Sequence, residues 1–167
     1  MQMQAKILVV DDELELLELY RELLVPLGAE IMTLSSAKAA LQLLDKEDFD
    51  CVLSDLKMPE MDGLNFCAGA RAKRPDIPFV FLTAHGDWKA GLQALRLGAN
   101  DFLEKPIQSD ELLKVMSFSC EVGLLRRKIR LELQNMADQK NASAMQVQQI
   151  LKDLSQIAWA RNLQSLG

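Results

Sequence analysis

Short apolar runs alternate with segments of helical periodicity along the first two thirds of the chain. Near-continuous apolar runs of this length are typical of strands that are buried on both faces of a parallel sheet. We therefore predict five strands, at Lys6–Val10, Glu30–Leu34, Cys51–Ser54, Phe79–Thr83 and, with the weakest pattern, Phe102–Glu104.

After each of these strands, apolar residues recur at helical spacing. The first helical pattern stops at Gly28 and the third at Pro75, residue types that commonly end helices. Side chains suited to capping a helix precede three of the segments, at Ser36, Asp87 and Ser109. The predicted helices are Glu13–Leu27, a segment from Ser36 through Leu44, Leu64–Arg74, Trp88–Leu97 and a long segment from Ser109.

This order of elements predicts an α/β fold with a doubly wound, five-stranded parallel sheet covered by helices on both faces. In such sheets, ligands bind beyond the carboxyl ends of the strands, at the point where the strand order reverses. The polar residues at or just after the ends of the predicted strands are Asp11, Asp12, Asp55, Thr83 and Lys105.

The residue types at these strand ends are suited to phosphoryl transfer. Three carboxylates in one place repel one another unless a cation neutralises them or some of them take up protons. Oxygen ligands suit Mg²⁺, which needs only one or two carboxylates besides water and phosphate oxygens. Lys105 would add a positive charge and Thr83 a hydroxyl donor, so the set predicts transfer of a phosphoryl group to the carboxylate of Asp55.

Charge narrows the choice of partners. The chain has 167 residues and a formal net charge of −5, with a net charge of −8 over residues 1–110 and of +3 over residues 111–167. The acidic part argues against nucleic-acid binding. The one basic cluster, Arg126, Arg127, Lys128 and Arg130, is short and typical of a solvated helix face.

No feature of the sequence indicates a membrane or an oxidising compartment. No apolar run approaches the ~18 residues that a membrane-spanning helix needs, and the acids at 11–13 interrupt the first apolar run, which argues against a signal peptide. The three cysteines, Cys51, Cys67 and Cys120, are widely spaced in apolar contexts, which predicts reduced core thiols. We expect a soluble cytoplasmic protein.

Five motifs together resemble the receiver domains of bacterial two-component response regulators. They are Val9-Val10-Asp11-Asp12, Leu53-Ser54-Asp55 followed by Met58-Pro59-Glu60-Met61-Asp62-Gly63, Leu82-Thr83-Ala84, Gly98-Ala99, and Phe102-Leu103-Glu104-Lys105-Pro106. The resemblance covers roughly residues 4 to 120. It implies a receiver domain over residues 1–120 with a flavodoxin-like sheet in the strand order 2-1-3-4-5.

The resemblance also implies roles for single residues. Asp55 is the expected phosphoacceptor, and Asp11 and Asp12 are the acidic pair that would bind Mg²⁺ together with Asp55, mainly through Asp12. Lys57 stands where the family uses a backbone carbonyl as a further metal ligand, so its side chain need not bind the ion.

Four further positions match the part of the family pattern that responds to phosphorylation. Thr83 and Lys105 are expected to bind the phosphoryl group, and Phe102 is expected to be the switch aromatic. The peptide bond matching Lys105-Pro106 is usually cis in the family, a form that proline makes accessible.

The family context implies a histidine kinase or a histidine phosphotransfer protein as donor, and a conformational switch at the face built by the fourth helix, fifth strand and fifth helix. The domain would be an enzyme only in its self-phosphorylation and autodephosphorylation. The alternative is a degenerate receiver that binds partners without phosphorylation. A phosphohydrolase of the haloacid-dehalogenase type is disfavoured, because it needs a second aspartate where this chain has Lys57.

The remaining residues, 121–167, predict a helical extension. One long helix would continue to about residue 140, and a second would occupy about residues 143–164. Heptad-like spacing of Val115, Val122 and Ile129 favours a homodimer slightly, although Gly123 and Glu132 interrupt the pattern. Docking of an unknown downstream protein is the second interpretation, and a linker within a fragment of a larger regulator is the third.

Overall fold

The computed structural model describes residues 4–84, 86–139, 145–146, 149–150 and 152–154. The chain forms two compact units, residues 1–123 and residues 124–167. No helix among the described residues is long and apolar enough to cross a membrane.

The first unit contains a five-stranded sheet in which each pair of neighbouring strands is parallel. The strand order is β2-β1-β3-β4-β5, which confirms the predicted flavodoxin-like fold. The strands are β1 (Lys6–Val10), β2 (Glu30–Leu34), β3 (Cys51–Asp55), β4 (Phe79–Thr83) and β5 (Asp101–Glu104).

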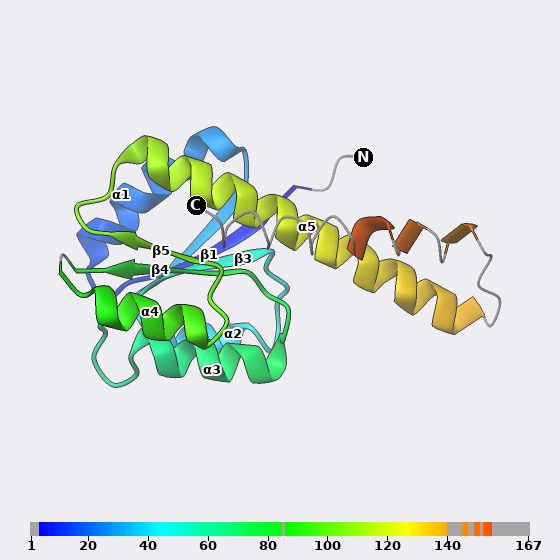
Figure 1. Cartoon of the computed structure of the whole chain (residues 1–167), viewed down its shortest axis with the longest axis horizontal. Coiled ribbons are helices and arrows are strands. Elements are labelled where there is room, and N and C mark those ends of the chain that lie inside the picture. The colour runs from blue at the N-terminus through cyan, green and yellow to red at the C-terminus, as the bar shows by residue number, and fades with distance from the viewer. Residues whose placement is uncertain (1–3, 85, 140–144, 147–148, 151, 155–167) are drawn as a thin grey trace. The chain divides into compact units, whose positions relative to one another are not determined.

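Helices cover both faces of this sheet (Figure 1). The helices are α1 (Leu14–Leu24), a 3₁₀ turn (Val25–Leu27), α2 (Ala37–Leu43), α3 (Gly63–Lys73), α4 (Trp88–Arg96) and α5 (Ser109–Gln139). Figure 1 shows α1 and the start of α5 on one face, and α2, α3 and α4 on the other.

Two apolar cores result, one on each face, because side chains of a strand alternate between the faces. The core beneath α2, α3 and α4 contains Leu8, Val10, Val52, Phe66, Phe79 and Phe81. The core beneath α1 and α5 contains Ile7, Val9, Leu53, Leu82, Leu103 and Met116. All three cysteines are buried free thiols, as predicted, and the Sγ atoms of Cys51 and Cys120 lie 3.5 Å apart.

Helix α1 is shorter than predicted. The apolar pattern predicts a helix to Leu27, but α1 ends at Leu24 and a 3₁₀ turn follows. Pro26 lies in that turn, and proline cannot donate the backbone hydrogen bond that an α-helix requires. Gly28 then adopts a φ of 61°, a left-handed conformation that glycine tolerates.

The three predicted helix caps have different outcomes. The Ser36 side chain accepts a hydrogen bond from the Ala39 N–H at 3.3 Å and caps α2, as predicted. Asp87 occupies the capping position of α4 but makes no side-chain capping bond, so this prediction was wrong. Ser109 is the first residue of α5 and not its cap, because the Leu112 N–H already bonds to the Gln108 carbonyl oxygen.

Gly123 does not interrupt α5, although glycine lowers helix propensity. A Cβ atom at this position would collide with the backbone carbonyl of Asp50, in the residue before β3. The missing side chain therefore lets α5 lie directly against the chain at the start of β3.

The second unit contains the end of α5 and helical residues at 145–146, 149–150 and 152–154. Ile129 and Ile150 are buried in it. Asp153, only 3% exposed, accepts hydrogen bonds from Lys128 Nζ at 3.4 Å and Gln149 Nε2 at 2.7 Å. The rest of the second helix predicted for residues 143–164 lies outside the described residues.

Candidate functional site

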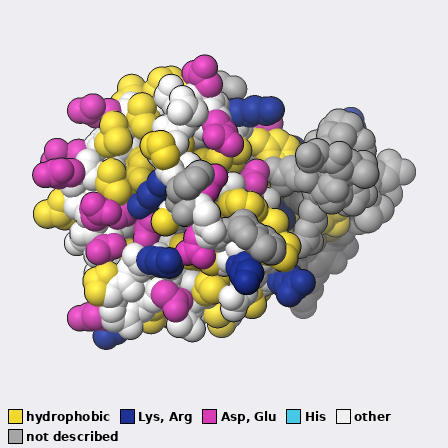
Figure 2. Space-filling view, turned by 60° about the vertical axis from the view of Figure 1, so that its left-hand side comes forward, with side chains coloured by type: hydrophobic (Ala, Val, Ile, Leu, Met, Phe, Trp, Pro, Cys, Tyr) yellow, Lys and Arg dark blue, Asp and Glu magenta, His cyan; other side chains and the backbone are white. Residues whose placement is uncertain are grey.

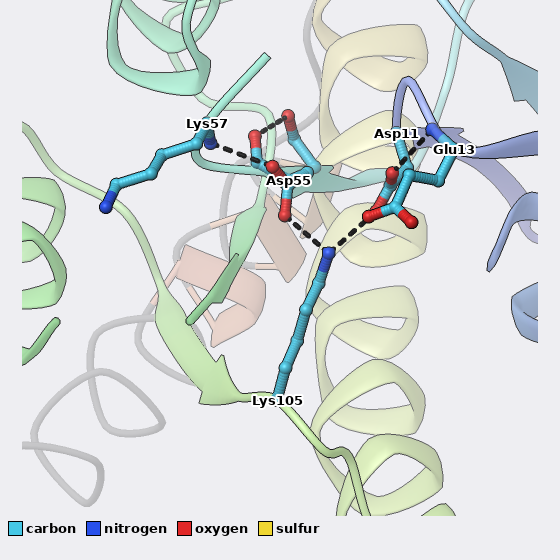
Figure 3. Close-up of polar contacts among 6 residues, drawn as sticks. Asp11, Glu13, Asp55, Lys57 and Lys105 are labelled. Carbon is cyan, nitrogen blue, oxygen red and sulfur yellow. Dashed lines mark hydrogen bonds and ion pairs between the residues drawn. The ribbon is translucent and has the colours of Figure 1, made fainter. Parts of the chain in front are cut away.

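A lysine bridges two carboxylates at the carboxyl edge of the sheet (Figure 3). Lys105 follows β5, Asp11 follows β1 and Asp55 ends β3. The Lys105 Nζ lies 3.0 Å from Asp11 Oδ2 and 2.7 Å from Asp55 Oδ1. These residues are far apart in the sequence, and they meet because the carboxyl ends of parallel strands share one edge of the sheet.

Backbone amides hold the second oxygen of each carboxylate. The Glu13 N–H donates to Asp11 Oδ1 at 3.0 Å, and the Lys57 N–H donates to Asp55 Oδ2 at 2.8 Å. Gly63 supports the same loop, because a Cβ atom there would collide with the backbone carbonyl of Asp55. Both carboxylates are thus fixed before any ligand binds.

The cluster carries more negative charge than its lysine can neutralise. Burial raises the pKa of Asp11, against the opposing effect of the Glu13 amide and of Lys105. Burial disfavours the charged form of Lys105, but its hydrogen bonds to Asp55 and Asp11 outweigh this, so its pKa lies well above the usual value. The lysine therefore stays protonated, and the remaining excess of negative charge favours a cation at this edge.

Tyr20 on α1 belongs to this electrostatic environment, which sequence reasoning missed. Its side chain is 2% exposed, and burial raises its pKa to about 12. The Lys105 ammonium acts in the opposite direction, and Asp11 and Asp55 reinforce the rise. Helical periodicity identified Tyr20 only as a core residue, because the pattern of one helix does not show what lies beside it.

The structure places the other predicted site residues around this cluster. Asp12 is exposed beside Asp11. Thr83 is 2% exposed at the end of β4, one residue beyond Leu82, the register partner of Asp55. Phe102 on β5 is half-buried and packs against the core beneath α2, α3 and α4.

The peptide bond between Lys105 and Pro106 is cis. The Lys105 N–H donates to the Thr83 carbonyl oxygen at 2.8 Å, which ties the residue after β5 to the end of β4. This places the Lys105 backbone beside the strand that carries Thr83.

The Lys57 side chain points away from the cluster and pairs with Asp87 before α4 (Figure 3 shows the outward direction). Its Nζ lies 2.7 Å from Asp87 Oδ2, and its side chain is 73% exposed. The Asp87 side chain thus pairs with Lys57 and makes no capping bond to α4. The path of two loops determines the pair, so spacing along the sequence gives no signal for it.

The donor set suits a hard cation that keeps some of its water. Among the described residues, no three histidine, cysteine, aspartate or glutamate side chains already form a closed ligand group. Mg²⁺ does not require one, because it is commonly bound by one or two carboxylates and several waters. The oxygen chemistry of Asp11 and Asp55, their excess charge and the exposed Asp12 nearby fit such an ion.

A doubly wound parallel sheet with an acidic cluster and a lysine at its carboxyl edge is the arrangement that the receiver-domain motifs of the sequence predicted. The sequence model of the response regulator receiver domain matches residues 7–117, and the chain belongs to this family. The resemblance found in the sequence motifs is thereby confirmed. The chain is a receiver domain of the kind found in bacterial two-component systems.

Individual relatives agree with this assignment. The chain is 36% identical over 104 residues to the regulatory protein LuxO of Vibrio cholerae, which covers 62% of this chain and 23% of LuxO. It is 35% identical over 133 residues to the C4-dicarboxylate transport transcriptional regulatory protein DctD of Pseudomonas aeruginosa, covering 78% of this chain and 29% of DctD. The match thus spans about a quarter of the length of these curated relatives.

Solved structures of response regulators also match the chain. A response regulator receiver domain protein from Clostridium thermocellum is 31% identical, with a TM-score of 0.66, over 75% of this chain and 98% of that one. NtrX from Brucella abortus is 32% identical, with a TM-score of 0.70, over 77% of this chain and 29% of that one.

Proposed function

We propose that this chain accepts a phosphoryl group on Asp55 from a histidine kinase or a histidine phosphotransfer protein, and then switches conformation. The Lys105 bridge between Asp55 and Asp11, in a member of the receiver family, is the observation that carries this proposal. The bond between phosphorus and the donor's imidazole nitrogen breaks as a carboxylate oxygen of Asp55 forms a new bond to phosphorus.

The residues around Asp55 prepare it for this reaction. Lys105 and the Lys57 amide hold the carboxylate in one orientation, which lowers the entropic cost of reaching the transition state. Lys105 is protonated and would lie where negative charge develops on the phosphoryl group. The buried Thr83, at the end of the neighbouring strand, would donate its hydroxyl to a phosphoryl oxygen.

Mg²⁺ belongs to the proposed site. Asp11, Asp12, Asp55 and the backbone carbonyl of Lys57 would hold the ion, which neutralises phosphoryl oxygens when it is bound. The Glu13 amide keeps Asp11 oriented toward the cluster and so prepares one ligand in advance.

The conformational response would run from Thr83 to Phe102. Thr83 would move toward the phosphoryl group, and the half-buried ring of Phe102 would enter the space that it leaves. Phe102 and α4 lie on the same face of the sheet, so the surface formed by α4, β5 and α5 would change. A partner that binds this surface would read the phosphorylation state.

The test is Mg²⁺-dependent phosphorylation by a small acyl phosphate, followed by intact-mass measurement. The parent protein should gain one phosphoryl group in the presence of Mg²⁺ and not after chelation of the metal. Asp55→Asn should gain none, because an amide oxygen is not a nucleophile of this kind.

Asp45→Asn is the matched control. Asp45 is exposed, pairs with Lys73, and lies after α2 at the opposite edge of the sheet. Labelling of the Asp55→Asn protein to the level of this control would overturn the proposal. A parent protein that takes up no phosphoryl group would instead support the degenerate receiver that binds partners without phosphorylation.

The helical extension is proposed to carry the output, with a homodimer through the C-terminal helix as the first candidate. Leu131 and Leu133 on α5 are 45% and 49% exposed in the second unit, and Met145 is 78% exposed. Covering such apolar side chains with a second chain is favourable. Docking of a downstream protein on the same residues is the alternative.

A further inference from the structure

Among the described side chains of helix α4, small residues face the protein and large apolar residues face solvent. Gly91 and Ala94 are buried, whereas Leu92, Leu95 and Leu97 at its end are 41%, 38% and 46% exposed. A helix usually attaches to a core through large apolar side chains. The side chains described for α4 that face the protein are instead small, which lets a side chain of a neighbouring element approach the helix backbone.

The ring of Phe102 on β5 makes this approach. A Cβ atom on Gly91 would lie 3.0 Å from Phe102 Cδ2 and Cε2, and 3.1 Å from Cγ. The ring therefore lies against the backbone of α4 where the helix has no side chain. Contacts this close require the neighbour to shift, and the neighbour here is a half-buried ring on the edge strand β5.

Glu104 adds a second connection between β5 and the start of α4. Its Oε1 accepts a hydrogen bond from the Gly86 N–H at 2.7 Å, in the loop before the helix. Glu104 and Phe102 are two residues apart on one strand, so their side chains point to the same face of the sheet. A substitution at residue 91 would place its side chain in direct contact with the Phe102 ring.

Glycine in the middle of a helix lowers stability relative to alanine, so its presence at residue 91 needs a reason. We propose that Gly91 is a positioning residue that holds the Phe102 ring in the unphosphorylated arrangement, and that the size of residue 91 sets the balance between the two states of the switch. This inference rests on the proposed function, because it assumes that Phe102 moves when Asp55 is phosphorylated.

The direction of the effect follows from population shift. A methyl group at residue 91 crowds the ring in the arrangement seen here. It therefore raises the free energy of the resting state relative to the switched state, in which the ring has left. A ligand that binds the switched state then binds more tightly, because less of its binding energy is used to change the conformation.

The experiment is a titration with beryllofluoride in the presence of Mg²⁺, on protein that carries 4-fluorophenylalanine. The chain has six phenylalanines, and Phe102→Leu identifies the fluorine signal of Phe102. In Gly91→Ala, we expect the free Phe102 signal to be displaced toward its bound position. We also expect the half-saturating beryllofluoride concentration to fall by roughly fivefold.

Gly69→Ala is the matched control. Gly69 is also inside a helix, and a Cβ atom there would lie 2.9 Å from Leu41 Cδ2, the end of a flexible side chain on the α2 side. This variant should leave both the Phe102 signal and the beryllofluoride titration unchanged. An effect equal to that of Gly91→Ala would show a general response to helix stabilisation and would overturn the inference.

A double variant separates the ring from the helix. In a Phe102→Leu background the methyl group at residue 91 has room, so adding Gly91→Ala should no longer change the half-saturating concentration. This background also keeps the test open if Gly91→Ala alone fails to fold. Persistence of the fivefold fall in the double variant would overturn the inference.

The phosphoacceptor function of Asp55 and the role of Gly91 are tested by different outcomes of this titration. Absence of any beryllofluoride response in the parent protein would contradict the proposed phosphoacceptor function. A normal parent response together with an unchanged or weaker titration in Gly91→Ala would leave the proposed function intact and overturn the role of Gly91 alone.

Discussion

Lys105 is the residue that partly neutralises the buried acids of the site. Its ammonium contacts both Asp11 and Asp55, and it is 24% exposed, whereas the Asp11 side chain is 1% exposed. A single cation thus separates two buried acids that would otherwise repel each other. In the proposed reaction the same cation would turn from Asp55 toward the phosphoryl group.

Replacing Lys105 should affect the switch more than the fold. We expect Lys105→Ala to lower the conformational response to beryllofluoride at least ~10-fold. We expect it to lower the free energy of unfolding by less than ~2 kcal/mol, because the acids can take up protons or solvent cations. Titration followed by fluorescence or NMR, together with urea unfolding, measures both quantities.

Lys6→Ala is a suitable comparison for that variant. Lys6 also forms ion pairs, with Glu30 and Glu47, but at the amino end of β1. Its replacement should leave the beryllofluoride response unchanged. A loss of stability in Lys105→Ala as large as that of a core truncation, ~2–5 kcal/mol, would show that Lys105 serves mainly the fold.

The titration of Tyr20, which lies near the site, can be observed without interference from other tyrosines. It is the only tyrosine of the chain, and its pKa is raised to about 12 from an ordinary value of 10.0. The folded protein therefore holds the phenol proton more tightly than the unfolded chain does. Stability should consequently fall as the pH rises from about 10 toward 12.

Tyrosinate absorbance tests this expectation directly. In denaturant the absorbance should rise around pH 10, and in the folded protein only near pH 12 or at unfolding. Coincident curves in the two states would contradict the buried position of the phenol. Tyr20→Phe should remove the absorbance change in both states.

Among the elements, the close approach of α5 to the start of β3 depends on Gly123. We expect Gly123→Ala to destabilise the protein by more than ~2 kcal/mol, because the new methyl group collides with the Asp50 backbone, which cannot rotate away. This exceeds the ~1 kcal/mol that alanine contributes to helix stability. Thermal or urea unfolding measures the difference.

The same substitution at Gly69 provides the comparison within helices. A methyl group there meets only the end of the Leu41 side chain, so Gly69→Ala should be neutral or stabilising. Equal effects of the two substitutions would contradict the importance of the Asp50 contact.

Elements with a strong local pattern could be predicted from the sequence to within about a residue. The strand β4 has the predicted bounds, and α3 begins and ends one residue before its prediction. The end of α1 was misplaced because the apolar spacing continues through Pro26, although the backbone bonding does not. Gly123 looked like a weak point in a helix, since its partner Asp50 is visible only in three dimensions.

The candidate site was predictable for a different reason. Asp11, Asp55 and Lys105 stand at strand ends, and a parallel sheet brings such ends together whatever the details of packing. The pair of Lys57 with Asp87 and the position of Tyr20 depend on loop paths and on helix packing. The local sequence does not show the loop paths or the helix packing.

For the whole molecule, charge and exposed apolar surface set what it can bind. Acidic side chains, with apolar ones between them, occupy much of the left-hand part of the face in Figure 2. The net charge of −5 favours basic or neutral partners. The curated relatives LuxO and DctD are about three to four times as long as the regions that match this chain.

The proposed homodimer is a property of the whole molecule and can be tested by measuring its mass. Light scattering after size exclusion should give a mass that doubles when beryllofluoride is added to the Mg²⁺ protein. Leu131→Glu together with Leu133→Glu should prevent the doubling, because charges on these exposed positions oppose apolar association. Leu19→Glu, a change of the same kind on exposed Leu19 of α1, serves as the control.

A mass that stays constant with the phosphoryl mimic would contradict phosphorylation-gated dimerisation. A constant monomer would direct attention to a downstream protein as the partner of the extension. A constant dimer would make the extension a fixed connection between two receivers.

The burial of all three cysteines has a practical consequence for studying this molecule. Cys51 and Cys67 are completely buried and Cys120 is 7% exposed, and burial raises the pKa of the Cys67 thiol. Protonated thiols that solvent does not reach react slowly with maleimides. A cysteine introduced at the exposed Lys46, at the edge of the sheet opposite the site, would therefore carry a single fluorescent label without removal of any native cysteine.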